Sequence, residues 1–243
     1  YPTPDSLKDK HINESVLIIG SGHSSKSLLK YKDKLREKFD VIISLNFSMK
    51  DFQDYSDYHM ILERKPTILA KWVRENRTNE KLIHIVNSVA VKFLPTNIPI
   101  IRTNRATVTD DMNIKEYTNA GLFDKFVGLT DATSVMIQAL HLAGIMGCGN
   151  IYMCGAEMVF KKQRHYYVEE IAMSNKPADR LKSKATKKIP IMFNGDEHFT
   201  IPVYKNSAIA ANKLIKGEFK KLNVSVSDFS GGLITEAIQI NFD

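Results

Sequence analysis

Cysteine is scarce in this 243-residue chain, which contains only Cys148 and Cys154. Two cysteines on either side of one apolar segment provide neither a disulfide framework nor the ligand spacing of a zinc site. No apolar run reaches the roughly 18 residues that a membrane-spanning helix requires. The chain begins without Met and without an apolar leader, so we expect it to be a trimmed piece of a longer protein. These absences predict a cytoplasmic protein, either free or at the inner face of the membrane.

The sequence has no excess of acidic residues; its net charge of +7 results from 34 basic and 27 acidic residues. The basic excess gathers in residues 161–164 and 180–188, and the second run has no interleaved aromatic residue. Such a cluster fits a solvated loop, an anionic ligand or a membrane surface as well as it fits nucleic acid. We therefore predict no nucleic-acid partner and keep peripheral membrane association as an alternative.

Apolar runs typical of buried strands alternate with helical patterns along the chain. The runs lie at residues 16–19, 39–46, 57–62, 81–86, 98–101, 150–155 and 223–227, and the helical patterns at 24–35, 66–76, 135–146 and 206–222. This alternation predicts an α/β fold, a single doubly wound, mostly parallel Rossmann-like sheet. We expect residues 1–243 to form one domain with a basic lid insertion over about 159–200, because a loop of that length in a compact domain is usually functional or disordered.

The first predicted strand ends in the glycine-rich segment Gly20-Ser21-Gly22-His23-Ser24. Glycine permits a tight turn or the close approach of a ligand, and the start of the following helix offers N–H groups that suit a phosphate. A purely structural turn uses the same residue types and remains the alternative. Ser25 replaces the third glycine of a dinucleotide fingerprint, and the second strand ends at Asn46 without a carboxylate, which argues against NAD. The Gly-Lys pair of a P-loop is also missing.

Further polar residues follow the predicted strand ends or precede a helix. They are Ser21, Ser24, Asn46, Asn87, Ser88, Thr133, Ser134, Gly155 and Glu157. Because ligands of parallel α/β sheets bind beyond the carboxyl ends of the strands, we expect these residues to meet in one crevice. Hydroxyls, amides and a single acid suit a ribose, a base and a phosphate, although turn formation or capping explains Asn46 or Ser134 alone equally well. His59 and His84 have no neighbours at metal-ligand spacing, so we interpret them as structural.

Several blocks resemble a glycosyltransferase superfamily. Residues 17–24 are similar to the opening of bacterial sialyltransferases that use CMP-activated sugars, and motility accessory factor glycosyltransferases and MptE-like pterin pyrophosphokinases open in a related way. The strand that ends at Asn46 and the segment 133–157 resemble the second and third blocks of these sialyltransferases. The closing helix, strand and 229–232 turn are similar to the end of the MptE-like and accessory-factor domains.

The resemblance assigns roles to named residues. It implies nucleotide binding by Gly20, Ser21, Gly22, Ser24, Asn46, Thr133, Ser134, Gly155 and Glu157. It implies that the lid tyrosines Tyr166 and Tyr167 stabilise the leaving phosphate through their O–H groups. The sialyltransferase base is a histidine shortly before the closing helix, where this chain has the segment 202–205 without histidine; the nearest candidates are His198 and His165.

The sequence therefore predicts a glycosyltransferase that moves an acidic sugar, such as a sialic acid, from a CMP-activated donor to a glycan acceptor during polysaccharide biosynthesis. The resemblance implies that this reaction requires no metal or other cofactor. One alternative is an MptE-like pyrophosphokinase that uses ATP and Mg²⁺, for which Asp110, Asp111, Asp131 and Glu157 offer carboxylates. The other alternative is a non-catalytic nucleotide-binding domain that has lost the base.

Overall fold

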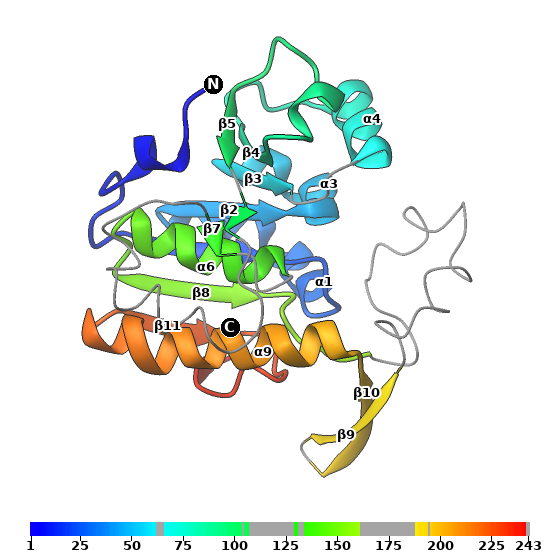
Figure 1. Cartoon of the computed structure of the whole chain (residues 1–243), viewed down its shortest axis with the longest axis vertical. Coiled ribbons are helices and arrows are strands. Elements are labelled where there is room, and N and C mark those ends of the chain that lie inside the picture. Colours follow the sequence, from blue (N-terminus) through cyan, green and yellow to red (C-terminus); the bar gives the residue numbers. More distant parts are fainter. Residues whose placement is uncertain are drawn as a thin grey trace.

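A parallel sheet of eight strands forms the centre of the computed structural model, in the order β12-β11-β8-β1-β2-β3-β4-β5 (Figure 1). The structure describes residues 1–61, 66–103, 105–106, 129–130, 134–160, 188–193 and 195–241. The strands are β1 (Ser15–Ile19), β2 (Val41–Leu45), β3 (Tyr58–Ile61), β4 (Ile83–Asn87), β5 (Ile100–Thr103), β8 (Asn150–Cys154), β11 (Ser225–Asp228) and β12 (Ile238–Gln239). Every neighbouring pair runs parallel, so the predicted α/β fold with a mostly parallel sheet is confirmed.

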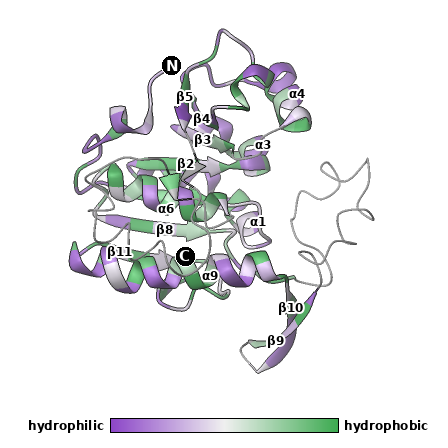
Figure 2. Ribbon diagram, in the orientation of Figure 1, coloured by the Kyte–Doolittle hydropathy of each residue, from purple (hydrophilic) through white to green (hydrophobic). Residues whose placement is uncertain are grey.

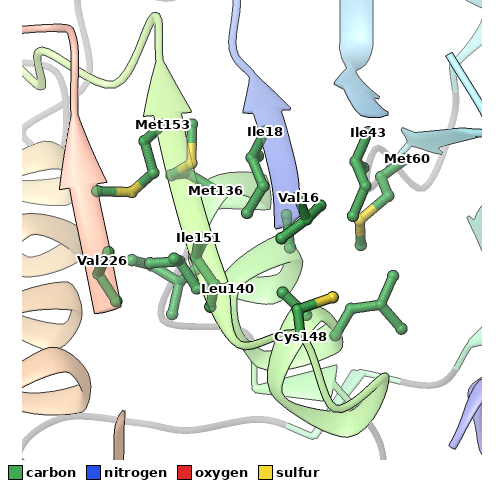
Figure 3. Close-up of a cluster of buried hydrophobic side chains, with 14 of the residues drawn as sticks. Val16, Ile18, Ile43, Met60, Met136, Leu140, Cys148, Ile151, Met153 and Val226 are labelled. Atoms are coloured by element: carbon green, nitrogen blue, oxygen red, sulfur yellow. The ribbon is translucent and has the colours of Figure 1, made fainter. Parts of the chain in front are cut away.

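Helices cover both faces of this sheet because its inner strands carry apolar side chains on both sides. In β1, Val16 and Ile18 pack toward α6 (Val135–Ile145), in a cluster to which α9 (Pro202–Leu214) also contributes (Figure 3). The alternate residues Leu17 and Ile19 belong to a cluster on the opposite face. That face is covered by α1 (Ser25–Leu28), α2 (Leu35–Lys38), α3 (Met49–Phe52) and α4 (Thr67–Asn76). Hydrophobic and hydrophilic stretches alternate along α9, as expected for a helix with one buried side (Figure 2).

The strand order reverses between β1 and β8. From β1 the chain adds β2, β3, β4 and β5 on one side, then returns to place β8 on the other side of β1. In open parallel sheets, a crevice for ligands forms at such a switch point, beyond the carboxyl ends of the strands. The topology therefore locates the crevice beside the ends of β1 and β8.

Several helices differ in extent from the sequence prediction. The predicted helix after the glycine loop is broken into α1, a 3-10 segment η2 (Leu29–Lys34) and α2. The last helix starts earlier than residue 206, since Pro202 occupies its first turn, where the missing N–H of proline costs nothing. It continues into a π-helical segment, η7 (Ile215–Phe219). The sequence pattern did not predict β12, which has only two residues.

The predicted lid at 159–200 contains an antiparallel hairpin in its described part. Strands β9 (Ile189–Phe193) and β10 (Asp196–Thr200) pair with each other and form a separate sheet that projects near the start of α9 (Figure 1). Residues 161–187, which make up most of the predicted lid, lie outside the described residues. A further short pair, β6 (Arg105–Ala106) and β7 (Leu129–Thr130), is also separate from the main sheet.

Candidate functional site

A cavity opens at the switch point, where the loops after β1, β2 and β8 meet the start of α6. It is lined by Gly20, Ser21, Gly22, Leu45, Asn46, Ser134, Val135, Met136, Gly155, Glu157, Met158, Val159 and Tyr204. Most of the residues predicted to bind a nucleotide are therefore neighbours in space, although they come from four separate segments of the chain. Asn87, at the end of β4, does not line the cavity; its amide oxygen accepts the N–H of Val89 in a local turn.

The glycines of the site let two loops touch. The N–H of Gly20 donates to the carbonyl of Cys154 at 2.7 Å, and the N–H of Gly22 donates to the carbonyl of Gly155 at 3.2 Å. A Cβ on Gly20 would lie 2.3 Å from the carbonyl oxygen of Gly155, and a Cβ on Gly155 would lie 2.5 Å from that of Gly20. Both distances are too short for any side chain. Close backbone packing therefore accounts for these glycines, as the structural alternative for this turn expects.

The carboxylate of Glu157 occupies the glycine loop. The N–H of Ser24 donates to Glu157 Oε1 at 2.5 Å, and a Cβ on Gly22 would lie 1.8 Å from Glu157 Oε2. The helix that follows, α1, has only four residues and therefore a weak dipole. The anion that meets this loop in the structure is therefore a side chain of the protein itself, and phosphate binding by the loop stays a prediction.

The serines of the loop tie strand ends together. Ser21 Oγ donates to the carbonyl of Leu45 at 3.3 Å and accepts the N–H of Ser48 at 3.1 Å, which joins the ends of β1 and β2. Ser24 Oγ accepts the N–H of Gly155 at 2.7 Å, which joins the loops after β1 and β8. These hydroxyls therefore hold the walls of the cavity in place.

Asn46 and Ser134 are two polar residues that line the cavity. Asn46 follows β2 with a φ of 49°, in the left-handed region that asparagine tolerates better than most residues. Its side-chain oxygen is buried and has no hydrogen-bond partner among the described residues. Ser134 is the N-cap of α6, where its Oγ accepts the N–H of Met136 at 3.2 Å. Since α6 has 11 residues, its N-terminus places a positive dipole end at the cavity.

Tyr204 is a cavity residue that sequence reasoning missed. It lies in the first turn of α9, and its phenol ring packs 6.1 Å from that of Phe160, between ring centroids. The sequence predicts that the last helix begins at residue 206, so Tyr204 lies outside that predicted helix. Proline at position 202 was the available signal, since proline is favoured in the first helical turn.

Of the four predicted catalytic residues, the structure describes only His198. His198 lies on β10, opposite Ile191 of β9, and does not line the cavity. Thr133, His165, Tyr166, Tyr167, Asp110, Asp111 and Asp131 lie outside the described residues. Within the described ranges, no group of three or more histidine, cysteine, aspartate or glutamate side chains is placed to hold a metal ion. The base, the lid tyrosines and metal dependence therefore stay predictions.

Comparison with known proteins shows a similarity at the level of the structure. No family model and no curated protein matches the sequence. The solved structure of the MAf glycosyltransferase from Magnetospirillum magneticum AMB-1 matches with a TM-score of 0.62 at 16% sequence identity. The similarity is one of fold. The match covers 98% of this chain and 36% of that chain, so the chain spans about a third of the length of that protein.

This finding supports the resemblance to motility accessory factor glycosyltransferases at the level of the fold. The resemblances to sialyltransferases and to MptE-like pyrophosphokinases stay predictions. No helix among the described residues has both the length and the apolar character needed to cross a membrane. Cys148 and Cys154 are both buried and unpaired with one another, as the sequence predicts.

A turn after β11 supports the loop that carries Glu157. Asp228, at the end of β11, accepts the N–H of Ser230 at 2.8 Å, and Ser230 Oγ accepts the N–H of Ala156 at 2.8 Å. The N–H of Leu233 donates to the carbonyl of Glu157 at 3.0 Å. Asp228 is fully buried, and burial raises its pKa to about 6, because the charged carboxylate loses its hydration.

Asp228→Asn is expected to stabilise the protein relative to the natural chain as the pH rises from about 4 to about 7. The folded chain retains the Asp228 proton up to about pH 6, whereas the unfolded chain releases it near 3.8. Each rise in pH between these values therefore costs the natural protein stability that the uncharged variant keeps. Urea unfolding at several pH values measures the difference. A difference that stays constant from pH 4 to pH 7 would contradict the raised pKa.

Proposed function

We propose that this chain is the nucleotide-sugar-binding part of a glycosyltransferase and that its donor is activated by a single phosphate, as in CMP-linked acidic sugars. The observation that carries the proposal is the cavity at the switch point between β1 and β8. The fold shared with a MAf glycosyltransferase supports the same class of activity. The transferred sugar would be an acidic one such as a sialic acid, and the acceptor a glycan.

The charge of the lining supports a donor with one phosphate. Among the described residues, the cavity has no lysine or arginine in its lining, and Glu157 adds a negative charge. Nucleoside diphosphates and triphosphates are usually held by cations or Mg²⁺, which offset several negative charges. A CMP-linked sugar has a single phosphodiester charge, which neutral donors and one helix N-terminus can stabilise.

The described residues divide into three roles in this proposal. The Asn46 amide and the Ser134 hydroxyl would bind the ribose or the base, since both line the cavity with polar groups. The N-terminus of α6 would stabilise the negative charge that develops on the phosphate as the bond to the sugar breaks. Tyr204 would place a phenol O–H on the side of the leaving group. Deprotonation of the acceptor hydroxyl stays assigned to His198 or His165.

Isothermal titration with CMP, CDP, UDP and ATP, each with and without Mg²⁺, tests this proposal. We expect CMP to bind without Mg²⁺ and ATP to give no heat of binding. Release of CMP from a CMP-linked acidic sugar then tests for turnover. Tight binding of ATP that depends on Mg²⁺ would contradict the transferase and support a pyrophosphokinase. Binding of CMP without any turnover would support a non-catalytic nucleotide-binding domain.

Asn46→Gly is expected to weaken CMP binding by about tenfold, because the variant keeps the left-handed backbone but loses the side-chain amide of a residue that lines the cavity. Asn13→Gly is the matched control. Asn13 also has a positive φ, 61°, but it is exposed and does not line the cavity. Equal affinities of both variants and the natural chain would exclude Asn46 from the site.

A further inference from the structure

Two histidines form a buried pair that contacts a residue of the cavity. His59 on β3 and His84 on β4 are register partners, and both are completely buried. Their Nδ1 atoms lie 3.0 Å apart, and their rings are nearly perpendicular at 80°. On its other side, His59 Nε2 lies 2.9 Å from the backbone carbonyl oxygen of Asn46. The pair is therefore joined by hydrogen bonds to a residue that lines the cavity.

The geometry fixes the positions of the protons. A carbonyl oxygen only accepts, so His59 Nε2 must carry the proton that bonds Asn46. A neutral imidazole has one N–H, so His59 Nδ1 is an acceptor and His84 Nδ1 must be the donor to it. His84 Nε2 then has a lone pair, and this buried atom has no partner within the described residues. Burial lowers the pKa of both histidines, which keeps them neutral at physiological pH.

Asn46 depends on this support because its backbone is unusual. It directly follows β2 and is the first residue of the 3-10 segment η3 (Asn46–Ser48), with a positive φ that costs energy for any residue other than glycine. Such a conformation persists only where its surroundings hold it. The bond from His59 holds the carbonyl of Asn46 and so restrains the backbone of this residue in the left-handed conformation that it has beside the cavity.

We propose that His59 is a positioning residue that holds Asn46 toward the ligand cavity, and that His84 fixes the tautomer of His59 needed for this bond. The inference rests on the proposed function in one respect, since it takes Asn46 to be a ligand contact. It adds to that function two residues that contact no ligand. On sequence alone, both histidines are interpreted as structural. The proposal gives them a positioning role as well, because His59 donates its hydrogen bond to a residue that lines the cavity.

Substitutions at His59 test whether its Nε2–H, which donates to the Asn46 carbonyl, contributes to ligand binding. His59→Phe removes the N–H that Asn46 accepts, and we expect the Kd for CMP to rise about tenfold. His59→Gln is the rescue variant, because its amide can donate to the Asn46 carbonyl and accept from His84; its Kd should stay within about threefold of the natural value. His141→Gln is the control for general destabilisation, since His141 is a buried histidine on α6 that does not line the cavity. Its Kd should not change even if its melting temperature falls.

A double-variant cycle with Asn46→Gly separates this inference from the proposed function. If His59 acts through the Asn46 side chain, His59→Phe should change the Kd less than twofold in the Asn46→Gly background. If Asn46→Gly weakens binding of CMP but His59→Phe does not, the positioning role is wrong and the proposed function stands. If the natural chain binds no CMP, the proposed function fails and the spectrum described next decides the positioning role.

Nitrogen NMR of the histidine side chains provides the measurement that needs no ligand. We expect protonated Nε2 in His59 and protonated Nδ1 in His84, with the other nitrogen of each ring unprotonated. His59→Phe should shift the side-chain amide resonances of Asn46, whereas His59→Gln should leave them close to their original positions. The opposite tautomers, or an Asn46 amide that responds to neither variant, would overturn the proposal.

Discussion

Replacing Gly155 with alanine is expected to reduce the free energy of unfolding by about 3 kcal/mol or more. Gly155 has a φ of +75°, which costs an alanine roughly 1–2 kcal/mol. The added Cβ would also lie 2.1 Å from Ser25 Oγ and 2.5 Å from the carbonyl oxygen of Gly20, so the loops after β1 and β8 must separate. Because those loops form the cavity, we also expect Gly155→Ala to lose CMP binding. Urea unfolding and titration with CMP measure the two effects.

Gly217→Ala is the matched control for this substitution. Gly217 lies in the π-helical segment η7, and a Cβ there would meet no atom within 4 Å among the described residues. Alanine costs less backbone entropy on folding than glycine, so this variant should be as stable as the natural chain or more stable by about 0.5–1 kcal/mol. If Gly155→Ala and Gly217→Ala had the same free energy of unfolding, the close packing of the two loops would not contribute to stability as proposed.

Acidification below pH 6.5 is expected to destabilise the protein through the His59–His84 pair. Unfolded histidine titrates near 6.5, whereas burial lowers the pKa of folded His84 to about 3 and that of His59 well below 6.5. The unfolded chain therefore binds more protons in this window, and stability falls as the pH falls. His84 alone would account for about 3 kcal/mol by pH 4. Protonated Asp228 opposes part of this loss below pH 6.

The double variant His59→Gln/His84→Asn isolates the contribution of the pair. It removes both titrating rings and retains amide groups that can form the same chain of hydrogen bonds to Asn46. Denaturant unfolding at pH 7, 6, 5 and 4 should show a clearly shallower loss of stability for the variant than for the natural chain. Parallel pH profiles would mean that the pair is already protonated or exposed in the folded protein.

Much of the sheet could be predicted because its strands are short apolar runs between polar turns. The runs at 16–19 and 41–45 are buried on both faces, and in the run at 151–154 only Tyr152 is partly exposed, which gives these strands nearly continuous hydrophobic patterns. Strand β12 has only two residues, both exposed, and so leaves no such pattern. Hairpin β9–β10 pairs outside the main sheet and lies within a basic region whose composition resembles a loop.

The sequence predicts which residues gather at the candidate site better than it predicts the contacts that these residues make with one another. Gly20, Asn46 and Gly155 follow parallel strands, so the topology brings them to one edge. The contact of Glu157 with the glycine loop joins residues far apart in sequence, and no local pattern records it. The His59–His84 pair likewise depends on the register between β3 and β4, which the sequence of either strand alone does not reveal.

The central place of β1 has a consequence for folding. Strand β1 is made early in the chain, but its partner β8 follows more than a hundred residues later, and the bond from Ser24 to Glu157 spans 133 positions. Contacts between distant segments form slowly, because a long loop must close before they contribute energy. During synthesis from the amino terminus, β1 and β2 can pair while one edge of β1 still lacks a neighbour. The cavity therefore does not exist until β8 docks, and ligand binding can serve as a late marker of folding.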